Sequence, residues 1–204
     1  YFLLKFKVKY LPIKLETYVD APPGSGLGSS STLVVCLVAA FSKLFNLNLN
    51  NFDLAEISYE IERKKLKISG GKQDQYAAVF GGFNWIEFKK NKKVIVHPIK
   101  LTQETINELE SRLLLYYTGR SRSSSNIIKD QISSVKKNDS SLNALHELKN
   151  NAIEIKNNLL LNNIDAIGKL LDKAWSIKKS SSKSITNDFL NNLYSDLKKN
   201  GVIG

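Results

Sequence analysis

The 204-residue sequence contains one cysteine, Cys36, and no methionine. A single cysteine cannot form an internal disulfide, which fits a reducing cytoplasm. No apolar run approaches the ~20 residues that a membrane-spanning helix needs. No charged start followed by an apolar stretch indicates a signal peptide. Because the chain begins at Tyr1 and lacks methionine, we interpret it as an internal part of a longer protein.

Arginine is also scarce, whereas lysine is abundant. Lysine and arginine total 30 against 19 acidic residues, which gives a net charge of +11. A strongly basic chain can bind nucleic acid or phosphate. Here the lysines and asparagines are spread over the whole chain, and the few arginines are not clustered among aromatic residues as in dedicated nucleic-acid binders. We favour a compositional origin for the charge and keep a basic nucleic-acid-binding module as the alternative of another class.

The first half of the chain mixes strand and helix patterns. Alternating apolar residues predict strands at 1–10 and 13–19, with a frayed helix end as an alternative for the first. Apolar residues at helical spacing predict a helix over about 33–44. Asp53, with Glu56 three residues later, resembles a capping box that opens a second helix ending near Lys67.

Further along, strands give way to helices. The pattern predicts a short helix from Gln73 to Phe80, a hairpin formed by 83–88 and 93–99, and a buried strand at 113–117. Residues 123–200 are expected to hold three or four amphipathic helices. Period and spacing alone therefore support a mixed α/β chain with two subdomains, the seam lying near 100–120.

A glycine- and serine-rich loop lies between the second predicted strand and the first long helix. Gly24, Gly26 and Gly28 allow positive φ and close approach of a ligand. The serines Ser29–Ser31 follow where the helix begins, and free N–H groups with the helix dipole favour a phosphate there. No Gly-Lys-Ser/Thr ends the loop, so it is not a Walker A motif. An ordinary N-cap behind a flexible turn is the simpler alternative.

The segment Pro22-Pro-Gly-Ser-Gly-Leu-Gly-Ser-Ser-Ser31 closely resembles the second signature of the GHMP kinases, in which this loop wraps the ATP phosphates. The resemblance implies cofactors ATP and Mg²⁺ and places Ser30 on the metal ion. The implied nucleotide-binding residues are Pro23, Gly24, Ser25, Gly26, Leu27, Gly28, Ser29, Ser30 and Ser31.

The same family places a Mg²⁺-binding glutamate and a catalytic aspartate at the spacing of Glu62 and Asp74. Such a pair suits phosphoryl transfer, which needs charge neutralised on the phosphates and a hydroxyl held in line. At the first turn of a helix the ionised form of Asp74 is favoured by the dipole, as suits a base or an orienting acceptor. Lys72 is a second catalytic candidate, able to lower the pKa of Asp74 or to contact phosphate. Taken singly, Glu62 could be a solvated helix residue and Asp74 a helix cap.

Longer stretches look like the bacterial branch that phosphorylates D-glycero-D-manno-heptose 7-phosphate. They are Gly71–Asn84, Tyr117–Arg122, Leu145–Lys149 and Ala174–Lys178. This implies a sugar-phosphate acceptor and a role in nucleotide-heptose synthesis for surface polysaccharide. Fucokinase- or galactokinase-like members share much of the pattern and remain the alternative. Tyr76, Arg120 and Arg122 are candidate acceptor contacts, since guanidinium groups bind phosphate bidentately.

The resemblance also implies the two-domain α+β fold of the family. Its N-terminal domain, expected over 1–105, carries a left-handed β-α-β unit, and its C-terminal domain, expected over 106–204, is helical and ferredoxin-like. The family's first signature and its glycine-rich third signature are not found in this sequence, so we expect the fold to be truncated at both ends. We expect no membrane partner, and the oligomeric state stays open, a homo-oligomer included.

Overall fold

The computed structural model describes residues 1–22, 24–119 and 124–204. The chain forms two compact units: an N-terminal unit of 1–97 with the described part of 116–125, and a C-terminal unit of 98–115 and 126–204. The domain boundary expected after residue 105 stays a prediction.

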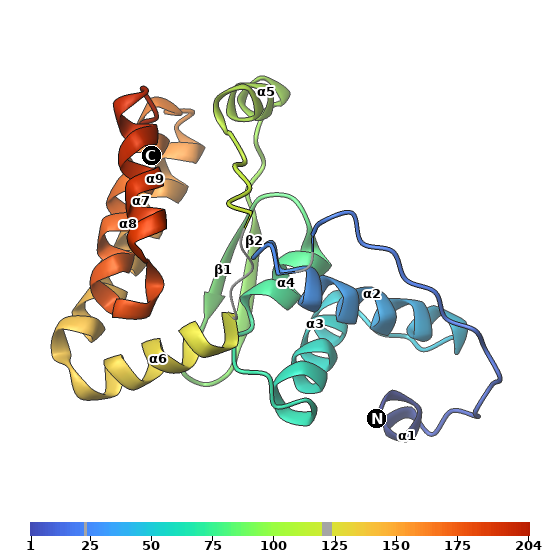
Figure 1. Cartoon of the computed structure of the whole chain (residues 1–204). Helices are drawn as coiled ribbons and strands as arrows, with labels where there is room; N and C mark the ends of the chain where they lie inside the picture. Colours follow the sequence, from blue (N-terminus) through green and yellow to red (C-terminus); the bar gives the residue numbers. More distant parts are fainter. Residues whose placement is uncertain (23, 120–123) are drawn as a thin grey trace. The chain divides into compact units, whose positions relative to one another are not determined.

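The N-terminal unit is a group of helices with one hairpin (Figure 1). Its elements are α1 (Phe2–Phe6), α2 (Ser29–Leu44), α3 (Asn51–Tyr59), the π-helix η1 (Glu60–Lys65), α4 (Gln73–Phe80), β1 (Asn84–Phe88) and β2 (Val94–Pro98). The predicted short helix and the predicted hairpin are confirmed by α4 and by β1 with β2. Gly81, at φ 61°, ends α4.

The core of this unit lies where α1, α2 and α3 meet. Phe2, Val38 and Ile57 are its buried members, and the ring centroids of Phe2 and Phe41 are 5.7 Å apart. Helices α2, α3 and α4 contact one another in pairs. Packing of the apolar faces of these helices therefore fixes the relative positions of the polar residues that they carry. Cys36 lies on the exposed side of α2.

Helix α3 begins one turn earlier than the sequence pattern suggested. The side chain of Asn50 accepts a hydrogen bond from the Asp53 N–H at 3.0 Å, and Asp53 accepts one from the Asn50 N–H at 3.0 Å. Asn50 is thus the cap and Asp53 the third residue of the capping box. The prediction of Asp53 as the cap was wrong because an asparagine three residues upstream offers an equivalent oxygen.

Three predicted strands are not strands in this structure. Residues 2–6 form α1, while 13–19 and 113–117 have no regular structure. The segment 113–117 is also exposed rather than buried. A strand needs a neighbour to satisfy its backbone groups, and the sheet seen in the described parts of the chain consists of β1 and β2 alone. In α1, the rings of Phe2 and Phe6 lie at helical spacing with their centroids 4.8 Å apart and their planes tilted by 47°.

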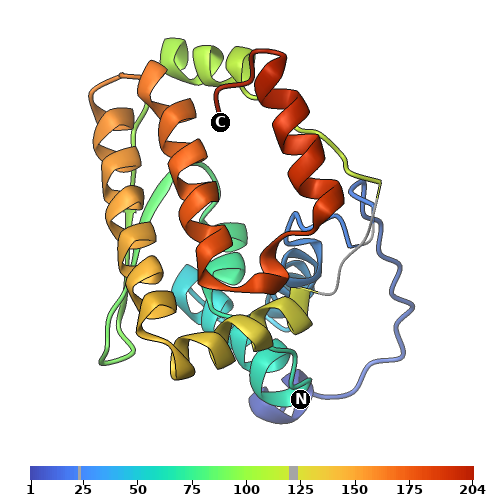
Figure 2. The same ribbon diagram turned by 60° about the vertical axis from the view of Figure 1, so that its left-hand side comes forward.

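The regular elements described in the C-terminal unit are all helical (Figure 2). It contains α5 (Gln103–Arg112), α6 (Ser124–Lys137), α7 (Asp139–Leu160), α8 (Asp165–Ser181), the 3-10 turn η2 (Lys183–Ile185) and α9 (Asp188–Lys199). Buried Asn151 of α7 donates to the Leu170 carbonyl of α8 at 3.0 Å, which fixes the register of these adjacent helices. Helix α5, capped by Thr102, was not predicted.

These elements confirm the α+β class, with many helices and a small sheet. The left-handed β-α-β unit and a ferredoxin-like sheet are not seen among the residues that the structure covers. None of the helices so described is long and apolar enough to cross a membrane.

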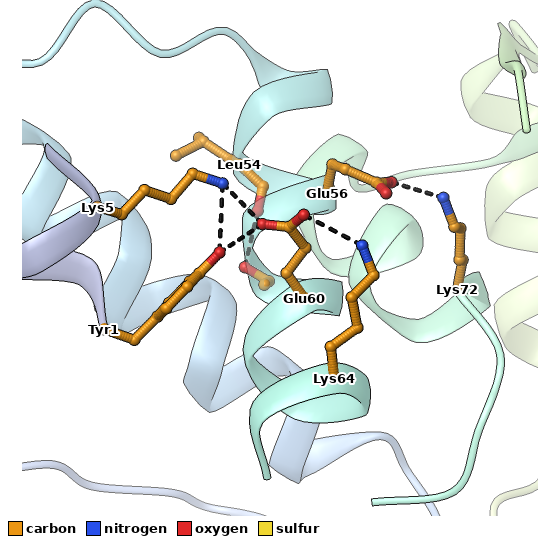
Figure 3. A network of polar contacts seen from close by, with 8 residues as sticks. Tyr1, Lys5, Leu54, Glu56, Glu60, Lys64 and Lys72 are labelled. Carbon is orange, nitrogen blue, oxygen red and sulfur yellow. Dashed lines mark hydrogen bonds and ion pairs between the residues drawn. The ribbon is translucent and has the colours of Figure 1, made fainter. Parts of the chain in front are cut away.

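Glu60 ties α1 to the π-helix (Figure 3). Its carboxylate accepts hydrogen bonds from Tyr1 at 2.5 Å, Lys5 at 2.6 Å and Lys64 at 3.1 Å. The hydrogen bond from Lys5, followed by that from Tyr1, lowers the pKa of Glu60 from 4.5 to about 2. The ionised form is therefore the one that holds α1.

We predict that Glu60→Gln loosens α1 by about 1 kcal/mol, the upper scale of partly exposed ion pairs. Because the folded pKa is depressed, this stabilisation is complete above pH 4.5 and disappears as the pH falls toward 2. Amide hydrogen exchange of residues 3–7 should be faster in the variant at pH 6. Glu16→Gln, which affects an exposed pair with Lys14 and an exposed hydrogen bond from Tyr18, is the matched control. Equal exchange in variant and wild type at pH 6 would contradict this role.

Candidate active site

The glycine-rich loop leads directly into α2. Gly24, Gly26 and Gly28 all have positive φ, at 73°, 80° and 74°, a conformation that other residues adopt only with strain. Gly28 is the N-cap of α2, whose first turn holds Ser29–Ser31. The first N–H groups of a helix have no partner within the helix, and a helix start that follows a glycine-rich loop suits an anion. Pro23, predicted to belong to this loop, lies outside the described residues.

Glu62 is the buried carboxylate of the site, with 1% of its surface exposed. Its Oε1 accepts a hydrogen bond from the Ser30 hydroxyl at 3.2 Å, and its Oε2 accepts one from Gln75 Nε2 at 2.5 Å. The nearest guanidinium nitrogen, of Arg63, is 3.9 Å from Oε1. The predicted metal-binding pair Ser30 and Glu62 is therefore in direct contact.

Asp74 lies in the first turn of α4 and is exposed. It lies beside the glycine loop: a Cβ added to Gly28 would be 3.8 Å from the Asp74 Cγ. The loop and the predicted catalytic carboxylate, 46 positions apart in the sequence, thus meet in one place. Their chemical roles stay predictions.

Lys72 and Tyr76 converge on a different carboxylate, Glu56. The Lys72 ammonium is 2.6 Å from Glu56 Oε2 and 4.6 Å from the centre of the Tyr59 ring. The Tyr76 hydroxyl donates to the same Oε2 at 3.4 Å. Burial, with a smaller contribution from the charge of Glu56, raises the pKa of Tyr76 to about 12. Lys72 therefore has its own counter-ion in this structure (Figure 3).

A cleft of about 300 Å³ adjoins this group. It is lined by Glu56, Tyr59, Lys64, Lys72, Phe88, Lys89, Lys92, Lys93 and Val94. We call it the lysine cleft, because lysines from the π-helix, the start of α4 and the hairpin turn outnumber its single acidic residue. Such a surface favours an anion. The other predicted phosphate contacts, Arg120 and Arg122, lie outside the described residues.

Sequence reasoning missed Gln75, which is fully buried between α2 and the π-helix. The only local signal was an amide next to Asp74. Reasoning from periodicity assigns such a residue to the helix surface, and only tertiary contact shows otherwise.

The oxygen donors of this site fit Mg²⁺, a hard ion that takes one or two carboxylates together with substrate phosphates. Ser30 and Glu62 provide a hydroxyl and a carboxylate in contact. No group of three metal-binding His, Cys, Asp or Glu side chains occurs within 1–22, 24–119 and 124–204. The contact between the Ser30 hydroxyl and the Glu62 carboxylate fits an ion that would also take ligands from substrate phosphates.

Similarity to known proteins identifies the class to which this protein belongs. Residues 1–82 match the family model "GHMP kinases N terminal domain", and the chain belongs to the GHMP kinases. It is 42% identical over 197 residues to D-glycero-alpha-D-manno-heptose 7-phosphate kinase of Campylobacter jejuni, covering 97% of this chain. It is also similar to L-fucokinase/L-fucose-1-P guanylyltransferase of Bacteroides fragilis, at 30% identity over 82% of the chain.

Among solved structures, a D-glycero-D-manno-heptose 1-phosphate kinase from Bacteroides thetaiotaomicron superimposes with a TM-score of 0.72 at 39% identity. That match covers 87% of this chain and 51% of the other. The chain likewise spans 58% of the Campylobacter jejuni enzyme and 18% of the Bacteroides fragilis one. The chain thus spans roughly half the length of the heptose-kinase relatives that it matches.

The backbone at Gly28 provides a test of the loop. We predict that Gly28→Ala destabilises the protein by about 1–2 kcal/mol, the cost of a side chain in the left-handed region. Steric overlap is not the cause of this destabilisation, since the new Cβ would sit at ordinary contact distance from Asp74. Gly71→Ala is the matched control, because a Cβ there meets nothing within 4 Å and its φ is not positive. Chemical denaturation of both variants measures the difference, and equal stabilities would refute the strained loop.

Proposed function

We propose that this protein is part of an ATP-dependent sugar kinase. It transfers the γ-phosphate to a hydroxyl of a sugar phosphate, with the anomeric hydroxyl of D-glycero-D-manno-heptose 7-phosphate as the best-supported acceptor. The product would enter synthesis of nucleotide-activated heptose for surface polysaccharide. The observation that carries the proposal is the meeting of the glycine loop, Glu62 and Asp74 at one place.

The loop would bind the nucleotide phosphates. Residues 24–31 present backbone N–H groups at the start of α2, where the helix dipole is also favourable. Ser30 and Glu62 would hold Mg²⁺, which neutralises charge on the β- and γ-phosphates when bound. Both side chains are held by α2 and the π-helix before any ligand arrives, so little reorganisation is needed.

Asp74 would act on the acceptor hydroxyl. Its exposed carboxylate lies beside Gly28 and would accept a hydrogen bond from a hydroxyl that approaches the end of the nucleotide. It would orient that hydroxyl in line with the γ-phosphate and take its proton as the new O–P bond forms and the bond from the γ-phosphorus to the departing ADP breaks. Lys72, paired with Glu56, would act on the anionic acceptor rather than on Asp74.

The acceptor class is supported by two independent observations. The similarity to the Campylobacter jejuni heptose 7-phosphate kinase extends over 97% of the chain, more than the similarity to the fucokinase relative. The lysine cleft, which reaches Lys72 two residues before Asp74, favours a phosphorylated acceptor over a neutral sugar. A fucokinase- or galactokinase-like activity is the second candidate.

Membership of a kinase family accounts for the glycine loop and Asp74, which a basic nucleic-acid-binding module does not require. The cytoplasmic location and the oligomeric state stay predictions.

The deciding experiment measures ADP release over a panel of acceptors: heptose 7-phosphate, fucose, galactose and mevalonate. We predict that Asp74→Asn leaves ATP affinity unchanged and lowers turnover by about a hundredfold or more, the scale of positioned acid–base help. ATP affinity is measured separately by calorimetry. Turnover of the variant at the wild-type level would contradict the mechanism, and preference for a neutral sugar would shift the assignment to the second candidate.

The lysine cleft gives a further prediction. Replacing Lys92 and Lys93 together by Gln should raise KM for the phosphorylated acceptor by about thirtyfold, since each of the two lost charge contacts to phosphate is worth roughly 1 kcal/mol. KM for ATP should not change. The paired replacement of Lys136 and Lys137, at the end of α6, is the matched control. An equal rise in both KM values in the cleft variant would remove the cleft from acceptor binding.

A further inference from the structure

Gln75 occupies an unusual position for an amide side chain. It projects from α4 into the contact between α2 and the π-helix, and none of its surface is exposed. Its Nε2 donates to Ser31 Oγ at 3.1 Å and to Glu62 Oε2 at 2.5 Å. One side chain thereby links the three elements that carry the candidate active site.

The orientation of the amide follows from its neighbours. An ionised carboxylate can only accept hydrogen bonds, so the NH₂ group of Gln75 must face Glu62. This directs Oε1 away from the carboxylate, and Oε1 is buried with no hydrogen-bond partner among the described residues. An unsatisfied buried acceptor costs roughly 1–3 kcal/mol. The amide is therefore not the choice that a stable core alone would favour.

The two oxygens of Glu62 are held by different partners. Gln75 takes Oε2, whereas Oε1 is turned toward the Ser30 hydroxyl. A carboxylate that is 1% exposed and hydrogen-bonded at each oxygen has few orientations left. Oε1, which contacts Ser30, lies beside the first turn of α2, where the nucleotide phosphates would lie.

We propose that Gln75 is a positioning residue, which fixes the Glu62 carboxylate for the metal ion of the bound nucleotide. The inference rests on the proposed function. It adds that adjacent residues on the same turn of α4 serve the two halves of the site: Asp74 would act on the acceptor hydroxyl, and Gln75 would orient the metal-binding carboxylate. Asp74 faces the glycine loop, and Gln75 holds the metal ligand.

The test compares ATP affinity by calorimetry in EDTA and in saturating Mg²⁺. The ratio of the two dissociation constants is the metal-dependent gain. In Gln75→Met, which keeps the length of the side chain but cannot donate, we expect this gain to fall about tenfold, the lower scale for residues that orient metal ligands. Affinity in EDTA should equal that of the wild type. A purely structural role would weaken binding in both conditions, because the loop itself would be disturbed.

A double-mutant cycle separates action through Glu62 from direct action. If Gln75 works through the carboxylate, then Gln75→Met causes no further loss of the metal-dependent gain in a Glu62→Gln background. Additive losses would overturn the proposal. Gln103→Asn, an exposed change in the C-terminal unit, is the control and should leave both affinities unchanged.

Two further outcomes are distinguishable. If the wild type binds no ATP, both the proposed function and the positioning role of Gln75 are refuted. If the wild type shows a metal-dependent gain that Gln75→Met retains, only the role of Gln75 is refuted. Should the Met variant not fold by circular dichroism, Gln75→Asn replaces it, since its shorter amide cannot span Ser31 and Glu62 together, and the same two outcomes decide.

Discussion

The buried carboxylate of Glu62 is the constraint on which the candidate site depends. A charged group removed from water is costly unless hydrogen bonds compensate for the loss of hydration. Here the compensation comes from Ser30 of α2 and Gln75 of α4, while Glu62 itself belongs to the π-helix. Helices that are distant in sequence must therefore meet in one register. The same register brings Asp74 beside Gly28.

The π-helix explains how one helical segment serves two purposes. Its wider turn is marked by the bond from the Leu66 N–H to the Ile61 carbonyl, five residues earlier. Such turns are rare and often found at functional sites. Within it, Glu62 points inward to Ser30 and Gln75, whereas Glu60 holds Tyr1 and Lys5. Glu62 thus belongs to the candidate site, whereas Glu60 anchors α1.

Local signals predicted the parts of the structure that local interactions decide. The bounds of α4 follow from the stop at Gly81, and the hairpin from two apolar runs around a lysine-rich turn. The glycine loop was recognisable because positive φ at Gly24, Gly26 and Gly28 requires that residue. The predicted strands failed for the opposite reason. The alternation at 13–19 and the apolar run at 113–117 indicate only that these segments suit a strand. A strand also needs a neighbouring strand to pair with, and that partner is not determined by the local pattern.

By itself, the sequence predicted the class of chemistry through its resemblance to the GHMP kinases: a glycine-rich loop before a helix, followed by a glutamate and an aspartate at the spacing of that family. The loop and the helix that follows it could be predicted because turn conformation and helix capping depend on residues only a few positions apart. Only the tertiary structure decided that Gln75 is buried, that Glu62 and not Glu60 faces Ser30, and that Lys72 pairs with Glu56. Those outcomes depend on how separate helices pack, and on the need to satisfy each buried polar atom.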